Sequence, residues 1–159
     1  MVRGGTPALV VLSAADVQFR VHEFDNDPAE RGYGLAAAVA LGVEPERVFK
    51  TLIATIDETN HAVAIVPVSG QLSLKELAAA LGAKRAEMCE VQAAERLTGY
   101  VVGGISPFGQ KRPLPTVIDE TCILFDTIFV SGGRRGLDIE IAPDDLIAIL
   151  SATSAPISV

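Results

Sequence analysis

The chain has 159 residues, the size of one ordinary domain, and 49% of them are hydrophobic, which is enough to bury a sizeable core. The formal net charge is −7, which argues against a broad basic surface of the kind that grips DNA or RNA unaided. A small basic patch for the end of a nucleic acid stays open, because cations occur in pairs at 84–85, 111–112 and 134–135.

The cysteines and histidines do not have the spacing of a metal site or of a disulfide framework. Cys89 and Cys122 are expected to be small core residues in a reducing cytoplasm. His22 lies in an alternating run, which favours a residue on the face of a strand over a ligand. We therefore expect no metal and no cofactor.

Nothing in the sequence predicts attachment to a membrane, because no apolar run is long enough to span one. The stretch after Arg3 faintly resembles a secretion signal, but it is too short and Pro7 stands at its start. Thr6 and Pro7 fit better as the N-cap and first residue of a helix. These features favour a cytoplasmic protein.

The first half of the chain predicts two short helices and three strands, of which the last two form an antiparallel hairpin. The helices are expected at 6–16 and 35–41, and the strands at 18–24, 48–56 and 61–68. A polar loop is expected from Phe24 to Gly34, and Gly42 ends the second helix.

The second half predicts a helix at 73–81, where Ser73 and Glu76 form a capping box, and further short elements. Those are helices at 91–97 and 144–150 and strands at 86–89, 100–102, 116–118, 128–130 and 137–141. Helices and strands do not alternate regularly. We therefore predict one α+β domain over 1–159, with short helices around a mixed or mostly antiparallel sheet that is partly barrel-like. Its core is expected at about 6–150, and residues 151–159 are expected to form a frayed tail.

Residues 100–119 contain the most informative loop, with three glycines, three prolines and the pair Lys111–Arg112 between two predicted strands. Glycine lets a backbone approach a ligand closely and proline fixes the shape of a loop, so such a segment can aim N–H groups at an oxygen. An ordinary long hairpin loop stiffened by prolines is an equal alternative. The run 104–111 lacks the spacing of a P-loop.

Two further segments carry polar groups in unusual settings. Lys50 stands inside the apolar strand VFKTL, so it must either point to solvent or be held by a ligand or a carboxylate. Residues 131–138 form a glycine-rich turn that offers a hydroxyl and a carboxylate, and a solvated turn is the alternative there.

Taken together, these segments resemble the YbaK family of freestanding aminoacyl-tRNA editing proteins, which are related to the editing domain of bacterial prolyl-tRNA synthetases. The resemblance runs from about residue 6 to 150. Its motifs are VFKTL, HAVAIVPVSGQLSLKELAAALGAKRAEM, TGYVVGGISPFGQKRPLPTVID and IFVSGGRRGLDIEI. The resemblance implies the fold of that editing domain.

The resemblance also implies roles for individual residues. Lys50 matches the essential lysine of the family, and Thr51 is its neighbour. The loop whose backbone faces the aminoacyl ester matches Gly103, Gly104, Ile105, Ser106 and Pro107, of which the first two are expected to stabilise the oxyanion. The remaining pocket residues are Phe24, Tyr33, Ser131 and Asp138. Close relatives often carry Tyr at position 24, so Phe24 removes a hydrogen-bonding phenol.

The activity implied is hydrolysis of the ester of Cys-tRNA(Pro), assisted by the thiol of the substrate itself, since no residue of the chain makes a convincing nucleophile or general base. The implied partners are the 3′ acceptor end of the aminoacyl-tRNA, stacked on Phe24 or Tyr33, and prolyl-tRNA synthetase. Two alternatives stay open: a deacylase for Ala-tRNA(Pro) or several small aminoacyl-tRNAs, and a non-catalytic module that binds the tRNA end or the synthetase.

Overall fold

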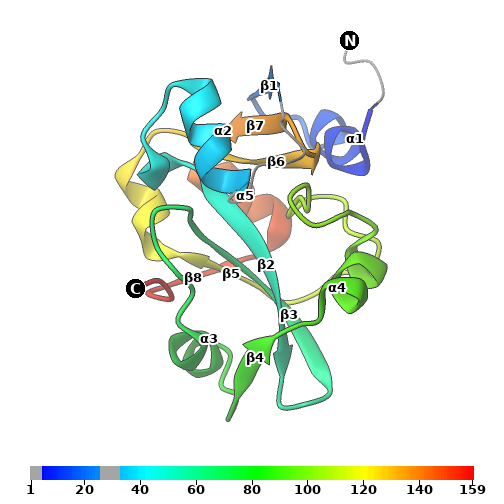
Figure 1. Ribbon diagram of the computed structural model, residues 1–159, viewed down its shortest axis with the longest axis vertical. Coiled ribbons are helices and arrows are strands. Elements are labelled where there is room, and N and C mark those ends of the chain that lie inside the picture. Colours follow the sequence, from blue (N-terminus) through cyan, green and yellow to red (C-terminus); the bar gives the residue numbers. More distant parts are fainter. Residues whose placement is uncertain (1–4, 26–32) are drawn as a thin grey trace.

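The computed structural model describes residues 5–25 and 33–159, which form two β-sheets with short helices around them (Figure 1). The predicted loop from Phe24 to Gly34 lies largely outside these residues. The helices are α1 (Pro7–Ala14), α2 (Tyr33–Leu41), α3 (Leu74–Ala80), α4 (Val91–Thr98) and α5 (Pro143–Leu150), with 3₁₀ turns η1 (Pro45–Arg47) and η2 (Glu120–Leu124). The strands are β1 (Phe19–Glu23), β2 (Phe49–Ile56), β3 (Asn60–Pro67), β4 (Ala86–Met88), β5 (Thr116–Asp119), β6 (Ile128–Arg134), β7 (Leu137–Ile141) and β8 (Thr153–Ala155).

The two sheets differ in topology. Strands β1, β7 and β6 form, in this order, a three-stranded antiparallel sheet. Strands β4, β2, β3, β5 and β8 form a five-stranded sheet, in which β5 runs parallel to both of its neighbours. A bridge between Val48 and Phe129 joins the sheets. The predicted α+β fold with mixed pairing is confirmed, and so is the antiparallel hairpin of β2 and β3.

The main core combines residues of both sheets with residues of α1 and α5. Phe49, Phe108 and Leu146 are among its largest fully buried side chains, and burying each contributes about 1.5–3 kcal/mol. Leu77 of α3 belongs to a second cluster with β2, β3 and β5. A third cluster surrounds Phe129, where α2 packs on the junction of the sheets.

The helices begin and end where their capping residues predict. The Thr6 hydroxyl accepts the Leu9 N–H at 3.3 Å, and the Ser73 hydroxyl accepts the Glu76 N–H at 3.2 Å. Gly99 ends α4 in the left-handed region, at φ +82°. No helix in the described ranges combines the length and the apolarity needed to cross a bilayer.

Residues 100–102 do not form the predicted strand. Tyr100 is buried inside the loop instead, where its hydroxyl donates to the Phe108 carbonyl at 2.6 Å. Val101 and Val102 are exposed. The apolar residues that predicted a strand are therefore used differently. Tyr100 packs in the core, Val101 and Val102 lie on the surface, and the three residues do not pair with a strand.

The prediction that residues 151–159 fray is wrong. Strand β8 pairs with β5, and Ile157 is fully buried in the cluster beneath α3. The buried carboxylate of Asp119 accepts the N–H groups of Ile157 and Ser158, each at 3.0 Å. Strand pairing, a buried apolar side chain and a buried carboxylate together anchor a segment whose composition favours disorder.

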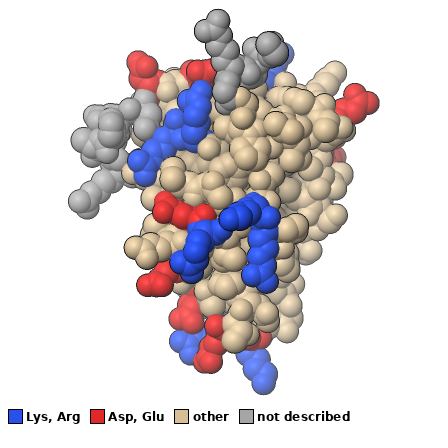
Figure 2. Space-filling view, turned by 90° about the vertical axis from the view of Figure 1, so that its right-hand side faces the viewer, with Lys and Arg blue, Asp and Glu red and all other residues tan. Residues whose placement is uncertain are grey.

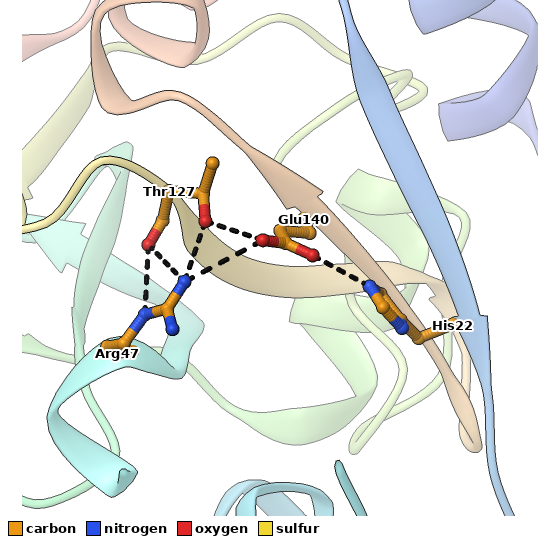
Figure 3. Close-up of polar contacts among 4 residues, drawn as sticks. All are labelled: His22, Arg47, Thr127 and Glu140. Carbon is orange, nitrogen blue, oxygen red and sulfur yellow. Dashed lines mark hydrogen bonds and ion pairs between the residues drawn. The ribbon is translucent and has the colours of Figure 1, made fainter. Parts of the chain in front are cut away.

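His22 lies on the face of β1, as predicted, in a polar network that ties β1 and β7 to η1 (Figure 3). Its Nε2 is 2.9 Å from Oε1 of Glu140, while the Thr127 hydroxyl donates to Oε2 at 2.6 Å. Arg47 donates to the Thr127 hydroxyl at 2.7 Å and stacks on Phe129. The Thr127 hydrogen bond, followed by the His22 and Arg47 interactions, holds the pKa of Glu140 below its usual value despite partial burial.

Candidate active site

A cavity of about 340 Å³ lies beside β2, where the two sheets, α2 and the start of α4 meet. Its walls also include the loop that follows α4 and the turn between β6 and β7. The cavity is lined largely by apolar side chains, with a few polar groups among them. Such a concave site with few polar groups is typical of small-ligand binding.

One wall of the cavity is an unpaired edge of β2. Strand β3 pairs with β2 along its whole length, but β4 pairs only with residues 54–56. The carbonyl of Ile53, which accepts the Cys89 N–H at 3.1 Å, points away from β3. Because alternate residues of an antiparallel strand point to the same side, the main-chain groups of Thr51 face this edge too. Among the described residues no strand pairs with β2 at Thr51 on this side, so the N–H and carbonyl of Thr51 lie beside the cavity.

The side chain of Thr51 is also without a partner. The residue is 8% exposed, and no group in the described part of the chain lies within hydrogen-bond distance of its Oγ1. This oxygen is itself shielded from the cavity, and a buried hydroxyl left unpaired costs about 1–3 kcal/mol.

Lys50 and Asp138 line the same cavity from different strands. Burial lowers the pKa of Lys50 and raises the pKa of Asp138 to about 7. The two side chains do not form an ion pair with each other. Each charge is therefore only partly compensated by the protein, a condition typical of groups that bind or transform a ligand. Ser131 lies directly opposite Asp138 in the β6–β7 register.

Gly103 lies in the wall formed by the loop after α4, where its backbone packs closely against Tyr33 and Arg135. Its φ is +87°, and a Cβ at this position would lie 2.7 Å from the Tyr33 ring and 2.8 Å from Nε of Arg135. The Arg135 Nε donates to the Val102 carbonyl at 2.9 Å, and its guanidinium carbon lies 4.5 Å from the centre of the Tyr33 ring. The Val102 N–H is held by the carboxylate of Glu95 at 2.8 Å. The loop is thus fixed on both sides.

The structure brings most of the predicted site residues together. Those that line the cavity are Phe24, Tyr33, Lys50, Thr51, Gly103, Ile105, Ser131 and Asp138. Gly104, Ser106 and Pro107 do not line it.

These three residues are buried within the loop, on the side away from the cavity. The Gly104 N–H donates to the Val101 carbonyl at 2.9 Å, so it is not free to bind an oxyanion as predicted. The Ser106 hydroxyl accepts the Phe108 N–H at 3.2 Å, Ser106 is fully buried, and Pro107 is also buried. A hydroxyl that closes its own turn has no access to a substrate, which corrects the binding role predicted for Ser106.

Among the cavity residues that were not predicted as site residues, two have a titratable side chain, Arg135 and Cys89. Arg135 was recognised only as part of a basic pair, although its place in the SGGRRG turn could have indicated its proximity to the loop. Cys89 was predicted to lie in the core but is half-buried in the cavity wall, whereas Cys122 is buried as predicted. Nothing in the local sequence distinguishes the two cysteines.

On the side of the molecule that carries α4, Figure 2 shows a small group of cations near the centre, with carboxylates beside it. The N–H groups of Lys111 and Arg112 donate to the carbonyls of Thr98 and Leu97, at 2.9 and 3.1 Å. These bonds place two exposed cations at the end of α4, next to Arg96 in its last turn. The basic patch formed by Arg96, Lys111 and Arg112 therefore adjoins the loop that leads to the cavity.

The described residues contain no cluster of three His, Cys, Asp or Glu side chains that could hold a metal ion. What they offer is a small cavity with one lysine, one carboxyl group of raised pKa and the main-chain groups at the edge of β2. This set can hold a small polar molecule and stabilise charge on it.

Comparison with known proteins identifies the family. Residues 32–149 match the aminoacyl-tRNA editing domain. The chain is 36% identical over 157 residues to EbsC of Enterococcus faecalis, a protein named as a Cys-tRNA(Pro)/Cys-tRNA(Cys) deacylase, and the match covers 96% of this chain and 93% of that protein.

The fold is also that of solved structures. One, described as a trans-editing enzyme for prolyl-tRNA synthetase, superposes with a TM-score of 0.85 at 22% identity, covering 100% of this chain and 99% of that one. Another, of the hypothetical protein APE2540, superposes with a TM-score of 0.87 at 22% identity, covering 97% and 100%. Since the sequence match spans most of the chain, the protein belongs to the aminoacyl-tRNA editing domain family.

Proposed function

We propose that this protein hydrolyses the ester of mischarged tRNA, with Cys-tRNA(Pro) as its principal substrate. The observation that carries the proposal is that Lys50, Thr51, Asp138 and the Gly103 loop line one cavity in a chain of this family. A proline-activating site cannot strongly reject cysteine, because small differences in size are worth only about 1–3 kcal/mol. A second, hydrolytic site removes the error.

The polar groups of the cavity match the polar groups of an aminoacyl ester. The carboxylate of Asp138, which has no ion-pair partner among the described residues, binds the α-ammonium group. The Gly103 main chain and the Lys50 ammonium group face the ester carbonyl, where negative charge develops during hydrolysis. The main-chain groups of Thr51, at the edge of β2, are placed to bind the polar groups of the amino acid.

The chemical step uses the substrate's own thiol. Its sulfur attacks the ester carbon, the bond from that carbon to the ribose oxygen breaks, and the thiol proton passes to the leaving hydroxyl group of the tRNA. Water then opens the resulting thiolactone to release cysteine. The protein contributes position and electrostatic stabilisation, since holding the reacting atoms together removes much of the entropic barrier.

Phe24 and Tyr33 form the aromatic part of the wall, where the terminal adenosine stacks. Phe24 cannot supply a phenol, so the substrate is held there by stacking alone. The basic patch of Arg96, Lys111 and Arg112 binds phosphates of the acceptor end.

The choice among tRNAs comes from a partner, for which we propose prolyl-tRNA synthetase, in the cytoplasm. The supporting observations are the net charge of −7, which disfavours broad tRNA contacts, and the description of the solved relative as a trans-editing enzyme for that synthetase. The isolated protein should then deacylate Cys-tRNA(Pro) and Cys-tRNA(Cys) comparably, and added synthetase should favour the former.

The test is deacylation of Cys-tRNA(Pro), Ala-tRNA(Pro) and Pro-tRNA(Pro) by the wild type, Lys50→Ala and the control Lys84→Ala. Lys84 is exposed on the turn before β4. We expect Lys50→Ala to lower the rate on Cys-tRNA(Pro) roughly 10²–10³-fold with an unchanged circular dichroism spectrum, and Lys84→Ala to match the wild type.

Each other outcome has a definite meaning. Faster hydrolysis of Ala-tRNA(Pro) would favour a deacylase for alanine. Binding of all three tRNAs without hydrolysis would favour a non-catalytic module. A folded Lys50→Ala variant with wild-type hydrolysis would contradict the catalytic role of Lys50.

A further inference from the structure

The loop after α4 begins with a tight turn whose central peptide is not fixed by the turn itself. The Gly104 N–H donates to the Val101 carbonyl at 2.9 Å, which closes a turn of four residues. Gly103, the third of them, has φ +87°, whereas Val102 does not have a positive φ, so the turn is of type II. Turns of types I and II keep the same closing hydrogen bond and differ in the orientation of the central peptide, which here joins Val102 to Gly103.

The orientation of this peptide affects the cavity, because Gly103 lines it. The carbonyl and the N–H of a trans peptide point in opposite directions, so a group that holds the Val102 carbonyl also sets the direction of the Gly103 N–H. Arg135 holds that carbonyl through its Nε at 2.9 Å. The Gly103 N–H itself donates to no acceptor within the described ranges.

Glu95, on α4, holds the N–H of Val102. Its Oε2 accepts this N–H at 2.8 Å, so both main-chain groups of Val102 are bonded to charged side chains. Hydrogen bonds to charged groups are stronger than neutral ones, and Val102 is 40% exposed, where water competes. In the buried part of the loop a neutral bond is used instead, from the Tyr100 hydroxyl to the Phe108 carbonyl.

The stability of α4 does not explain a glutamate at position 95. Glu95 lies in the last turn of the helix, where the helix dipole disfavours a carboxylate. Although Arg96, Lys111 and Arg112 lie at this end of α4, Glu95 forms no ion pair within the described part of the chain. Its carboxylate bonds to the Val102 N–H instead. Glu95 does not line the cavity, so any effect on a ligand there passes through the loop.

We propose that Glu95 is a positioning residue for hydrolysis, which acts through the turn at Val102 and Gly103 and does not touch the substrate. With Arg135 it holds the turn in the type II form, in which the Gly103 N–H is presented to the ester oxygen as negative charge develops there. This catalytic consequence rests on the proposed function. The hold on the turn rests only on the contacts of Glu95.

The experiment compares steady-state hydrolysis of Cys-tRNA(Pro) by the wild type, Glu95→Ala, Glu95→Gln and the control Gln92→Ala, which changes an exposed residue of the same helix. We expect Glu95→Ala to lower kcat roughly tenfold or more and to leave KM within about twofold, because a misplaced donor weakens stabilisation of the transition state more than substrate binding. Glu95→Gln keeps an oxygen that accepts the Val102 N–H and should recover most of kcat. Gln92→Ala should match the wild type.

Three results would overturn the proposal. The first is a folded Glu95→Ala variant, by circular dichroism, with unchanged kcat. The second is a raised KM at unchanged kcat, which would place Glu95 in substrate binding. The third is an equal loss of kcat in Glu95→Ala and Glu95→Gln, which would show that the charge acts and not the hydrogen bond.

Amide hydrogen exchange, measured residue by residue by NMR, tests the hold on the turn without any substrate. The Val102 N–H should exchange roughly 3–10-fold faster in Glu95→Ala than in the wild type, and Glu95→Gln should restore most of the protection. Equal exchange in the wild type and Glu95→Ala would refute the hold. If no variant and no wild-type sample hydrolyses a mischarged tRNA, the proposed function fails together with the catalytic consequence, and the exchange rates still decide whether Glu95 holds the turn.

Discussion

The guanidinium group of Arg135 stacks on the ring of Tyr33, at 4.5 Å from its centre, and donates from Nε to the Val102 carbonyl at 2.9 Å. One side chain thereby connects α2, the loop after α4 and the β6–β7 turn. All three segments line the cavity, so this contact fixes the distance between its walls.

Loss of the stacking should loosen the cavity without unfolding the protein. A cation–π pair at a partly exposed site contributes about 0.5–1 kcal/mol and stacking of a base about 1–3 kcal/mol, so Tyr33→Leu should lower kcat/KM for Cys-tRNA(Pro) roughly 10-fold or more. Tyr33→Phe keeps the ring and should recover most of that loss. Equal losses in both variants would show that the hydroxyl, not the stack, matters.

Gly103 should tolerate no side chain. In Gly103→Ala the new Cβ would meet Tyr33 and Arg135 at 2.7–2.8 Å, and the φ of +87° adds backbone strain. The matched control is Gly42→Ala, with φ +68° but no atom within 4 Å of the added Cβ. Both should lose about 1–2 kcal/mol of stability, but only Gly103→Ala should lose more than about tenfold in kcat/KM. Similar kinetics for the two variants would mean that backbone strain alone acts.

Hydrolysis should depend on pH through Asp138. Burial raises its pKa to about 7, and the proposed binding of the α-ammonium group requires the carboxylate, so kcat/KM should rise as pH increases through about 7. The measurement is the pH–rate profile, corrected for spontaneous ester hydrolysis. Asp138→Asn should lack this inflection.

The same shift affects stability in the opposite direction. Between the unfolded pKa of 3.8 and about 7, the folded protein holds a proton that the unfolded chain has released, so the free energy of unfolding should fall as pH rises across this window. In Asp138→Asn this decline should be weaker. An unchanged slope in urea titrations from pH 4 to 7 would contradict the raised pKa.

Glu140 should show the reverse sign, because its folded pKa is lowered. Its contribution is present above the unfolded value of 4.5 and is lost as pH falls below it. Glu140→Gln should therefore destabilise the protein at pH 7 by about 1 kcal/mol and have little effect in acid. Glu87→Gln, which breaks an exposed pair with Arg85 at 3.8 Å, should be nearly neutral at both.

The C-terminal segment should be essential for stability. Ile157→Ala should cost about 2–5 kcal/mol, because Ile157 is fully buried beneath α3. Val159→Ala is the control, since Val159 is 82% exposed. If thermal unfolding midpoints of the two variants coincide, the segment is not anchored as described.

The sequence predicted those elements whose signals are local. Thr6, Ser73 and Gly99 mark helix ends through hydrogen bonds or backbone angles that depend on near neighbours, and these ends are confirmed. Strand β8 was missed because its pairing with β5 and its anchor at Asp119 are distant in the chain. Residues 100–102 were misassigned because burial in a loop and burial in a strand select the same apolar residues.

For the site, the family motifs predicted which residues line the cavity better than which groups are available there. Lys50, Thr51 and Asp138 do line it. The N–H of Gly104 is already bonded to the Val101 carbonyl, and Arg135 reaches the loop after α4, and both facts depend on packing that no motif records.

The short pairing of β4 with β2 has a consequence for any attempt to make this protein more robust. Extending β4 by a few residues would pair the main-chain groups of Thr51 with a neighbouring strand. Such a variant would resist heat better, but the added strand would occupy the cavity. Variants selected only for thermal resistance should therefore tend to lose hydrolysis by completing the sheet.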